Sequence, residues 1–102
     1  MVDRIIAGTI NSDGSVKYGS GFSVSRPSEG HFMISFRPAF SQINGASATE
    51  IYDGDTRDNA VIISLSSTDL YVKVGDSHGD AKNRDFTFIA SGIGEVTAAK
   101  SS

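Results

Sequence analysis

Two short segments hold most of the side chains that could bind a ligand or a metal ion. Residues 53–59 read Asp-Gly-Asp-Thr-Arg-Asp-Asn, and residues 76–80 read Asp-Ser-His-Gly-Asp. Carboxylate, imidazole, guanidinium and amide groups in loops are suited to binding sugar hydroxyls, and clustered carboxylates are suited to hard cations. With the tyrosine that precedes the first segment, the candidate ligand-binding residues are Tyr52, Asp53, Asp55, Arg57, Asp58, Asn59, Asp76, His78 and Asp80.

Calcium is one candidate ligand of the first segment, through Asp53, Asp55 and Asp58. The EF-hand pattern is not met, because the position that requires glycine is Asp58 and the position that requires glutamate is Ser64. The alternative is a solvated loop whose Asp, Gly and Asn residues form turns. We expect no cofactor, with calcium as the open alternative.

The second segment has the same two interpretations. Asp76, His78 and Asp80 could ligate a divalent metal or contact a sugar, and the alternative is a flexible hairpin loop. The other histidine, His31, lies in a distant segment, so a site with two histidines would require two subunits to meet.

An enzyme is not expected. A nucleophile elbow needs a serine on a sharp turn between a strand and a helix, and no segment has a convincing helical pattern. Gly19-Ser20-Gly21 is better interpreted as a kink or bulge between two strands. A small β-fold hydrolase remains only as a third hypothesis.

The elements that must position these segments are β-strands, because apolar and polar residues alternate through most of the chain. Turn sequences separate the alternating runs: Asp13-Gly14 is typical of a tight hairpin, and residues 27–30 begin with Pro and end with Gly. Only residues 41–52 would also tolerate a helical turn. The expected strands are 3–10, 15–18, 20–26, 31–37, 42–52, 60–66, 69–75 and 85–91.

Seven to eight short strands with this alternation predict an all-β fold, an antiparallel β-sandwich that is jelly-roll-like. We expect one domain over residues 1–95 and a flexible C-terminal tail over 96–102. The predicted core consists of Ile6, Ile10, Phe22, Val24, Phe32, Ile34, Phe36, Phe40, Ile51, Ile63, Leu65, Leu70, Val72, Val74, Phe86 and Phe88.

Three apolar or aromatic side chains lie on strand faces that should be exposed to water. Met33, Ile62 and Tyr71 each alternate against predicted core residues. Such a face is often covered by another subunit, so these residues predict an interface of a homo-oligomer. The alternatives are a second layer of the same chain or scattered surface residues.

Composition excludes several classes of partner and site. The 102 residues include no cysteine, which rules out disulfides, thiolate nucleophiles and Cys-ligated zinc. A net charge of −3 without a basic cluster argues against nucleic acid. No apolar run approaches the roughly 20 residues of a membrane span, and the first residues lack a signal-peptide pattern. We therefore expect synthesis in the cytoplasm without a signal peptide, and no membrane insertion.

The first forty residues also carry a recognisable order of motifs. Gly8-Thr9-Ile10 is followed by Asp13-Gly14-Ser15, by Gly21-Phe22 and Val24 to Arg26, and by Gly30 through Phe36 to Phe40. Over residues 4–40 this resembles a β-rich terminal module of phage tail-fibre-like and bacterial collagen-like proteins. It is also similar to trimeric jelly rolls of the C1q and tumour-necrosis-factor type.

The resemblance implies a trimer that binds carbohydrate or a cell surface and is virion- or tail-associated or released. The leading hypothesis is therefore an oligomeric, lectin-like binding module that recognises a glycan or cell surface through its long loops. The second is a purely structural, self-assembling piece of a fibre, capsid or scaffold.

Overall fold

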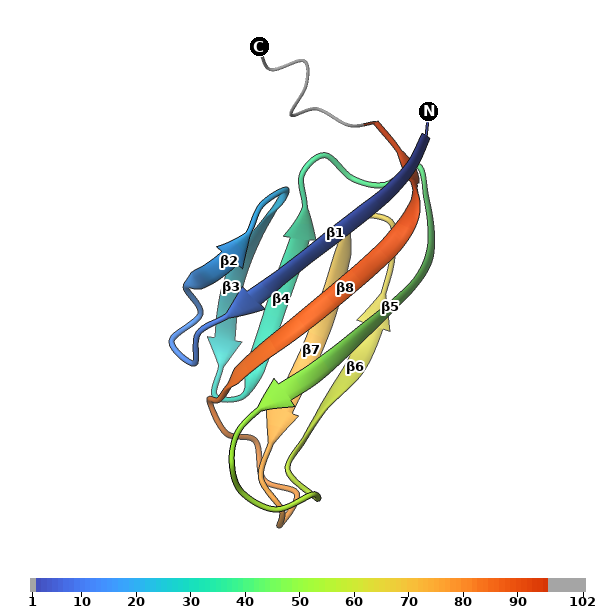
Figure 1. The fold of residues 1–102 in the computed structure, drawn as a ribbon. Helices are drawn as coiled ribbons and strands as arrows, with labels where there is room; N and C mark the ends of the chain where they lie inside the picture. The colour runs from blue at the N-terminus through green and yellow to red at the C-terminus, as the bar shows by residue number, and fades with distance from the viewer. Residues whose placement is uncertain (1, 96–102) are drawn as a thin grey trace.

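The computed structural model describes residues 2–95, which form eight strands in two four-stranded sheets (Figure 1). The strands are β1 (Val2–Ile10), β2 (Val16–Gly19), β3 (Phe22–Ser28), β4 (His31–Phe36), β5 (Gln42–Ile51), β6 (Asn59–Leu65), β7 (Asp69–Gly75) and β8 (Asp85–Gly94). The all-β sandwich is therefore confirmed. Within the described range no helix is long and apolar enough to cross a membrane. The tail expected at 96–102 lies outside the described residues.

The two sheets have different strand orders, and every pairing is antiparallel. Sheet A has the order β2-β1-β8-β5, and sheet B has the order β3-β4-β7-β6. The chain passes between the sheets after β2, β4, β5 and β7. The first and last strands pair along their length, from Val2 opposite Gly94 to Ile10 opposite Phe86. Figure 1 shows β1, β8 and β5 crossing in front of the strands of sheet B.

The predicted strands agree with the observed ones to within a few residues, and residues 42–51 form a strand rather than a helical turn. Both predicted glycine turns are present. Gly14 and Gly30 have φ angles of 94° and 72°, which only glycine adopts readily. A Cβ atom on Gly30 would also lie 2.6 Å from the carbonyl oxygen of Val74, so this turn packs closely against the end of β7.

The core lies between the sheets and is built from the inward side chains of both. Aromatic pairs join them: the ring centroids of Phe32 and Phe86 are 5.0 Å apart, and those of Phe22 and Phe88 are 4.9 Å apart. Edge and tilted ring contacts of this kind add to the free energy gained from burial. The buried hydrophobic residues are Ile6, Ile10, Phe32, Ile34, Phe36, Phe40, Ala60, Leu70, Val72, Val74, Phe86, Phe88 and Ala90.

Two residues predicted in the core are on the surface, because bulges shift the alternation. The β6–β7 register changes between Ile62 and Ser64, so Ile63 is 47% exposed and Ile62 packs against the core. The prediction that Ile62 faces outward is therefore wrong. In β5 the register changes between residues 43 and 45, after which Glu50 takes an inward position and Ile51 is 49% exposed.

The burial of Arg4 was not predicted. Arg4 is 7% exposed and donates hydrogen bonds from Nη1 to the carbonyl oxygens of Pro38, at 2.7 Å, and Ala39, at 3.3 Å. Its guanidinium lies 4.8 Å from the centroid of the Phe40 ring. Arg4 thus ties β1 of sheet A to the β4–β5 connection, and burial lowers its pKa.

Candidate functional site

The two polar segments singled out in the sequence lie at the same end of the sandwich. Residues 52–58 connect β5 to β6 and residues 76–84 connect β7 to β8, and both are at the lower end in Figure 1. They are brought together by the pairing of β6 with β7, in which Asn59 is opposite Gly75. An antiparallel pair therefore delivers the end of one loop beside the start of the other.

Arg84 fastens the two loops to each other. Its Nη1 donates to Oε2 of Glu50 at 3.0 Å and to Oδ1 of Asp58 at 3.2 Å. The guanidinium also lies 3.5 Å from the centroid of the Tyr52 ring, a cation–π contact. We call Glu50, Tyr52, Asp58 and Arg84 the Arg84 cluster.

The charged side chains of the Arg84 cluster are largely shielded from water, whereas Tyr52 is 53% exposed. The side chains of Glu50 and Asp58 are 3% and 7% exposed, and that of Arg84 is 16% exposed. Burial raises the pKa of Glu50, and the hydrogen bond and charge of Arg84 oppose that shift. A buried carboxylate requires such a partner, since an unpaired buried charge is strongly destabilising. Tyr52 and Asp58 therefore help to hold the loops in place.

The β5–β6 loop is also ordered by its own side chains. Asp55 accepts hydrogen bonds from the backbone N–H of Arg57 and from its guanidinium, with Nη2 2.8 Å from Oδ2. These contacts lower the pKa of Asp55. Asp58 Oδ2 accepts from the backbone N–H of Asp55. Asp55 and Asp58, two of the three calcium candidates, thus have their carboxylates in protein contacts.

In the β7–β8 loop the carboxylate of Asp76 organises the backbone. Its Oδ1 accepts hydrogen bonds from the backbone N–H groups of His78, at 2.9 Å, and Asp80, at 3.0 Å. The bond from Asp80 is the main cause of a lowered pKa for Asp76, so this carboxyl is ionised at neutral pH. Its other oxygen, Oδ2, accepts no hydrogen bond from any residue between 2 and 95.

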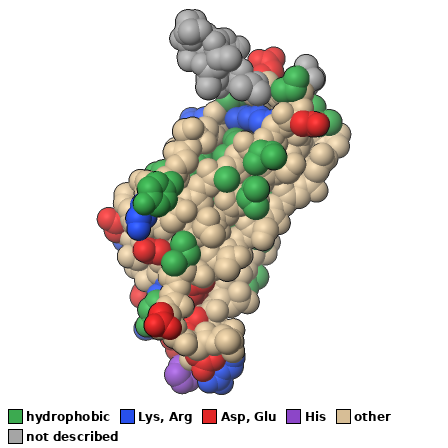
Figure 2. Space-filling view, viewed as in Figure 1, with side chains coloured by type: hydrophobic (Ala, Val, Ile, Leu, Met, Phe, Trp, Pro, Cys, Tyr) green, Lys and Arg blue, Asp and Glu red, His purple; other side chains and the backbone are tan. Residues whose placement is uncertain are grey.

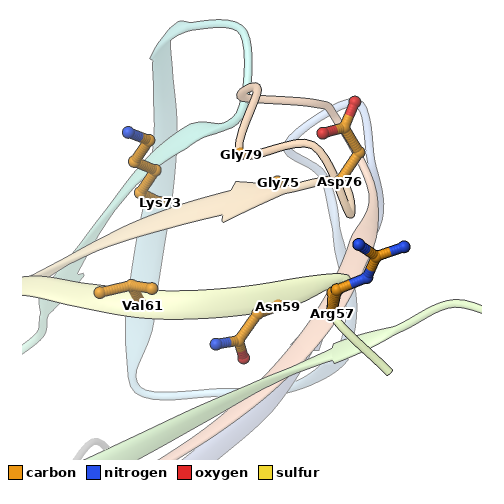
Figure 3. A pocket seen from close by; sticks show the side chains of 7 residues that line it. All are labelled: Arg57, Asn59, Val61, Lys73, Gly75, Asp76 and Gly79. Atoms are coloured by element: carbon orange, nitrogen blue, oxygen red, sulfur yellow. The ribbon is translucent and has the colours of Figure 1, made fainter. Parts of the chain in front are cut away.

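Between the loops the structure has a shallow pocket of about 260 Å³ on the outer side of sheet B (Figure 3). Its floor includes Val61 and Lys73, which are opposite each other in the β6–β7 pairing. The lining residues are Arg57, Asn59, Val61, Lys73, Gly75, Asp76 and Gly79.

The pocket thus combines cationic, anionic and amide groups with an exposed aliphatic side chain. The ammonium group of Lys73 makes no hydrogen bond or ion pair with any described residue. Asn59 uses its Oδ1 to accept from the backbone N–H of Ala60, which leaves its Nδ2 to donate outward. Val61 is 52% exposed and supplies apolar contact area. Such a mixture can bind a polar molecule that also has an apolar face.

Of the nine predicted ligand-binding residues, the pocket brings together Arg57, Asn59 and Asp76. His78 and Asp80 flank the lining residue Gly79, and the remaining four belong to the loop that carries Arg57. Val61 and Lys73 were not predicted. The signal for Lys73 was the alternation in β7, where Leu70, Val72 and Val74 point inward and Lys73 must point outward near the loop.

The outer face of sheet B continues from the pocket. Met33 is opposite Tyr71 in the β4–β7 pairing, and both are half-buried on this outer face, as predicted. The His31 ring lies 6.0 Å from the Tyr71 ring, and its Nδ1 is 2.9 Å from the carbonyl oxygen of Glu29. Apolar and aromatic surface therefore extends from the pocket along β4 and β7.

Among residues 2–95 no three His, Asp or Glu side chains are arranged to hold a metal ion. The calcium hypothesis stays a prediction. A calcium ion at residues 53–58 would have to displace the contacts that Arg57 and Arg84 make with the carboxylates.

The comparisons with known proteins add no family. The chain matches no protein-family model, and neither the curated proteins nor the solved structures contain a match. The resemblance of residues 4–40 to tail-fibre and collagen-like modules therefore stays a prediction.

Proposed function

We propose that this protein is an oligomeric binding module that recognises a glycan through the pocket between the β5–β6 and β7–β8 loops. The observation that carries the proposal is the composition of this pocket. Sugars present hydroxyl groups for hydrogen bonds and C–H faces for apolar contact, and the pocket offers both kinds of partner.

The roles of the lining residues follow from their polar atoms that have no hydrogen-bond partner among the described residues. Asp76 Oδ2 would accept from a sugar hydroxyl, and Asn59 Nδ2 and Lys73 Nζ would donate to hydroxyl or carboxylate oxygens. Val61 would contact the C–H face. The loops need little rearrangement for this, since the Arg84 cluster and the Asp55–Arg57 contact hold them. A preorganised site loses less entropy when it binds.

A glycan array with the whole chain tests the proposal. We expect the wild-type protein to bind, and Lys73→Ala and Asp76→Ala to lose most of that binding. Lys17→Ala is the matched control, because Lys17 is exposed on β2 of the other sheet. An array to which the wild-type protein does not bind, or a K73A variant that binds as well as K17A, would overturn the proposal.

The purely structural alternative predicts an oligomer without any glycan binding. The trimeric state, the jelly-roll likeness and the association with a virion or tail remain predictions from the resemblance. Sedimentation and the array together distinguish the two functions, because only the binding module gives signals in both.

A further inference from the structure

The outer face that β1, β8 and β5 form in sheet A is free of charge between its two ends, and charge returns at the edge strand β2, where Lys17 Nζ lies 5.6 Å from the centroid of the Tyr18 ring. Outward positions in β1, β8 and β5 alternate with buried ones. Between Asp3 at one end and Asp85 at the other, the outward positions include Ile5, Ala7, Thr9, Gly45, Ser47, Thr49, Thr87, Ile89 and Ser91, and Ile93 lies opposite Asp3 and the uncharged Gln42. We call these ten residues the sheet A face. Figure 2 shows its middle as backbone and uncharged side chains, without Lys, Arg, Asp or Glu.

This absence of charge is unusual for a surface exposed to water. Charged residues make up 21% of the chain, close to the average of about 25% in soluble domains, yet none lies among these ten positions. The sheet A face also displays large aliphatic side chains: Ile5 is 67% exposed and Ile89 is 47% exposed. No other described segment covers them.

Large and small side chains lie next to each other on the sheet A face. The cross-strand rows are Thr9–Thr87–Thr49, Ala7–Ile89–Ser47 and Ile5–Ser91–Gly45. Ile5 and Ile89 stand in adjacent rows with small side chains around them. A second sheet with the same pattern can approach to about 10 Å, the usual distance between packed sheets, with each isoleucine over a small residue of its partner.

We propose that two copies of this chain associate face to face through their sheet A faces. A two-fold contact places identical surfaces against each other, which requires a surface that does not repel itself. An uncharged face meets that condition, although the chain as a whole carries −3. A foreign partner would more commonly be selected by charge complementarity, and this face offers none.

The available area supports a weak dimer. The ten residues of the sheet A face extend along β8 from Thr87 to Ile93, about 24 Å, and three strands at about 4.8 Å spacing span about 15 Å, so these residues cover roughly 350 Å² in each copy. With the rim residues at both ends of the ten-residue strands β5 and β8, which are about 34 Å long, each copy contributes roughly 500 Å² and the pair buries roughly 1,000 Å², near the lower limit for a specific interface. The pockets lie on the outer sides of the two B sheets, so the dimer leaves both of them open.

Sedimentation velocity of the whole chain tests the inference. Protein concentrations from about 5 to 500 µM cover the range in which so small an interface should associate. We expect a reversible monomer–dimer equilibrium in the wild type, and a trimer, which the resemblance of residues 4–40 implies, would overturn the inference. Ile89→Asp should raise the dissociation constant by roughly tenfold or more, because the carboxylates must be desolvated in the interface. Ile63→Asp is the matched control, since Ile63 is also 47% exposed but belongs to sheet B.

A second variant is needed because Ile89→Asp could also weaken the dimer by destabilising the folded monomer. Ser47→Arg introduces a charge from β5 beside Ile89, at a position that is exposed. It should also shift the equilibrium to monomer while its thermal unfolding stays close to that of the wild type. A wild type that is monomeric throughout, or a dimer that I63D weakens as much as I89D does, would overturn the inference.

Discussion

Replacing Arg84 with methionine should destabilise the protein far more than an equivalent change on the surface. Methionine keeps most of the length of the side chain and its contact with Tyr52, but it removes the charge that faces Glu50 and Asp58. Two buried carboxylates then lack their partner. Breaking a buried ion pair in this way costs about 3–5 kcal/mol. Because Arg84 is 16% exposed, we expect a somewhat smaller loss, about 2–4 kcal/mol.

Urea denaturation of R84M measures this loss. For a domain of this size, with an m-value of about 1–2 kcal/mol/M, the midpoint should fall by roughly 2 M without a change in m. The control is Arg57→Met. Arg57 and Asp55 also form an ion pair within the β5–β6 loop, but their side chains are 72% and 41% exposed. Exposed pairs contribute about 0–1 kcal/mol, so R57M should shift the midpoint little.

The pH dependence of R84M provides an independent check. Burial already raises the pKa of Glu50, and loss of Arg84 should raise it further. A carboxyl whose pKa rises on folding binds its proton more tightly in the folded state, so stability increases as the pH falls toward that pKa. The deficit of R84M should therefore shrink between about pH 7 and pH 5, and Glu50→Gln should restore part of it at pH 7. If R84M costs no more than R57M at either pH, the reasoning is refuted.

Two further changes have expected outcomes. Gly92→Ala should lower the melting temperature clearly, because the Cβ atom of the new alanine would clash with the carbonyl oxygen of Gln42. Gly45→Ala is the control and should leave the melting temperature nearly unchanged, because no atom lies within 4 Å of a Cβ atom at that position. Equal melting curves for the two variants would contradict this. Calcium and EDTA should not alter the melting temperature, since the carboxylates of Asp55 and Asp58 are already in contact with arginines, and a calcium-dependent rise would show that the ion displaces them.

The strands and most of the core could be predicted because burial on one side of a sheet imposes a period of two. Phe32, Ile34 and Phe36 follow that rule without interruption, and their outward neighbours were also placed correctly. Bulges break the rule. The additional residue in β6 turns Ile63 outward, and no feature of Val61-Ile62-Ile63 distinguishes the bulged position from its neighbours.

The candidate site could be predicted only in part, because its elements come from different strands. Local composition identified the loops that contain Arg57 and Asp76. It could not show that Lys73 and Val61 complete the pocket, since that depends on the β6–β7 register. Local composition also could not show that Asp58 accepts a hydrogen bond from Arg84, which is 26 residues away in the sequence. Composition suggests which groups are present, and register decides which of them meet.

The pairing of β1 with β8 also has a consequence for how the chain reaches this structure. β8 is an inner strand of sheet A and holds both β1 and β5, so neither can acquire its main partner until the last strand has been synthesised. Sheet A contains one hairpin of neighbouring strands, β1–β2, and sheet B contains two, β3–β4 and β6–β7. Local hairpins form in microseconds, whereas pairings across long loops are slow. The two hairpins of sheet B can therefore form before β8 is available, whereas the β4–β7 pairing that joins them, like the completion of sheet A, depends on strands that are distant in the chain.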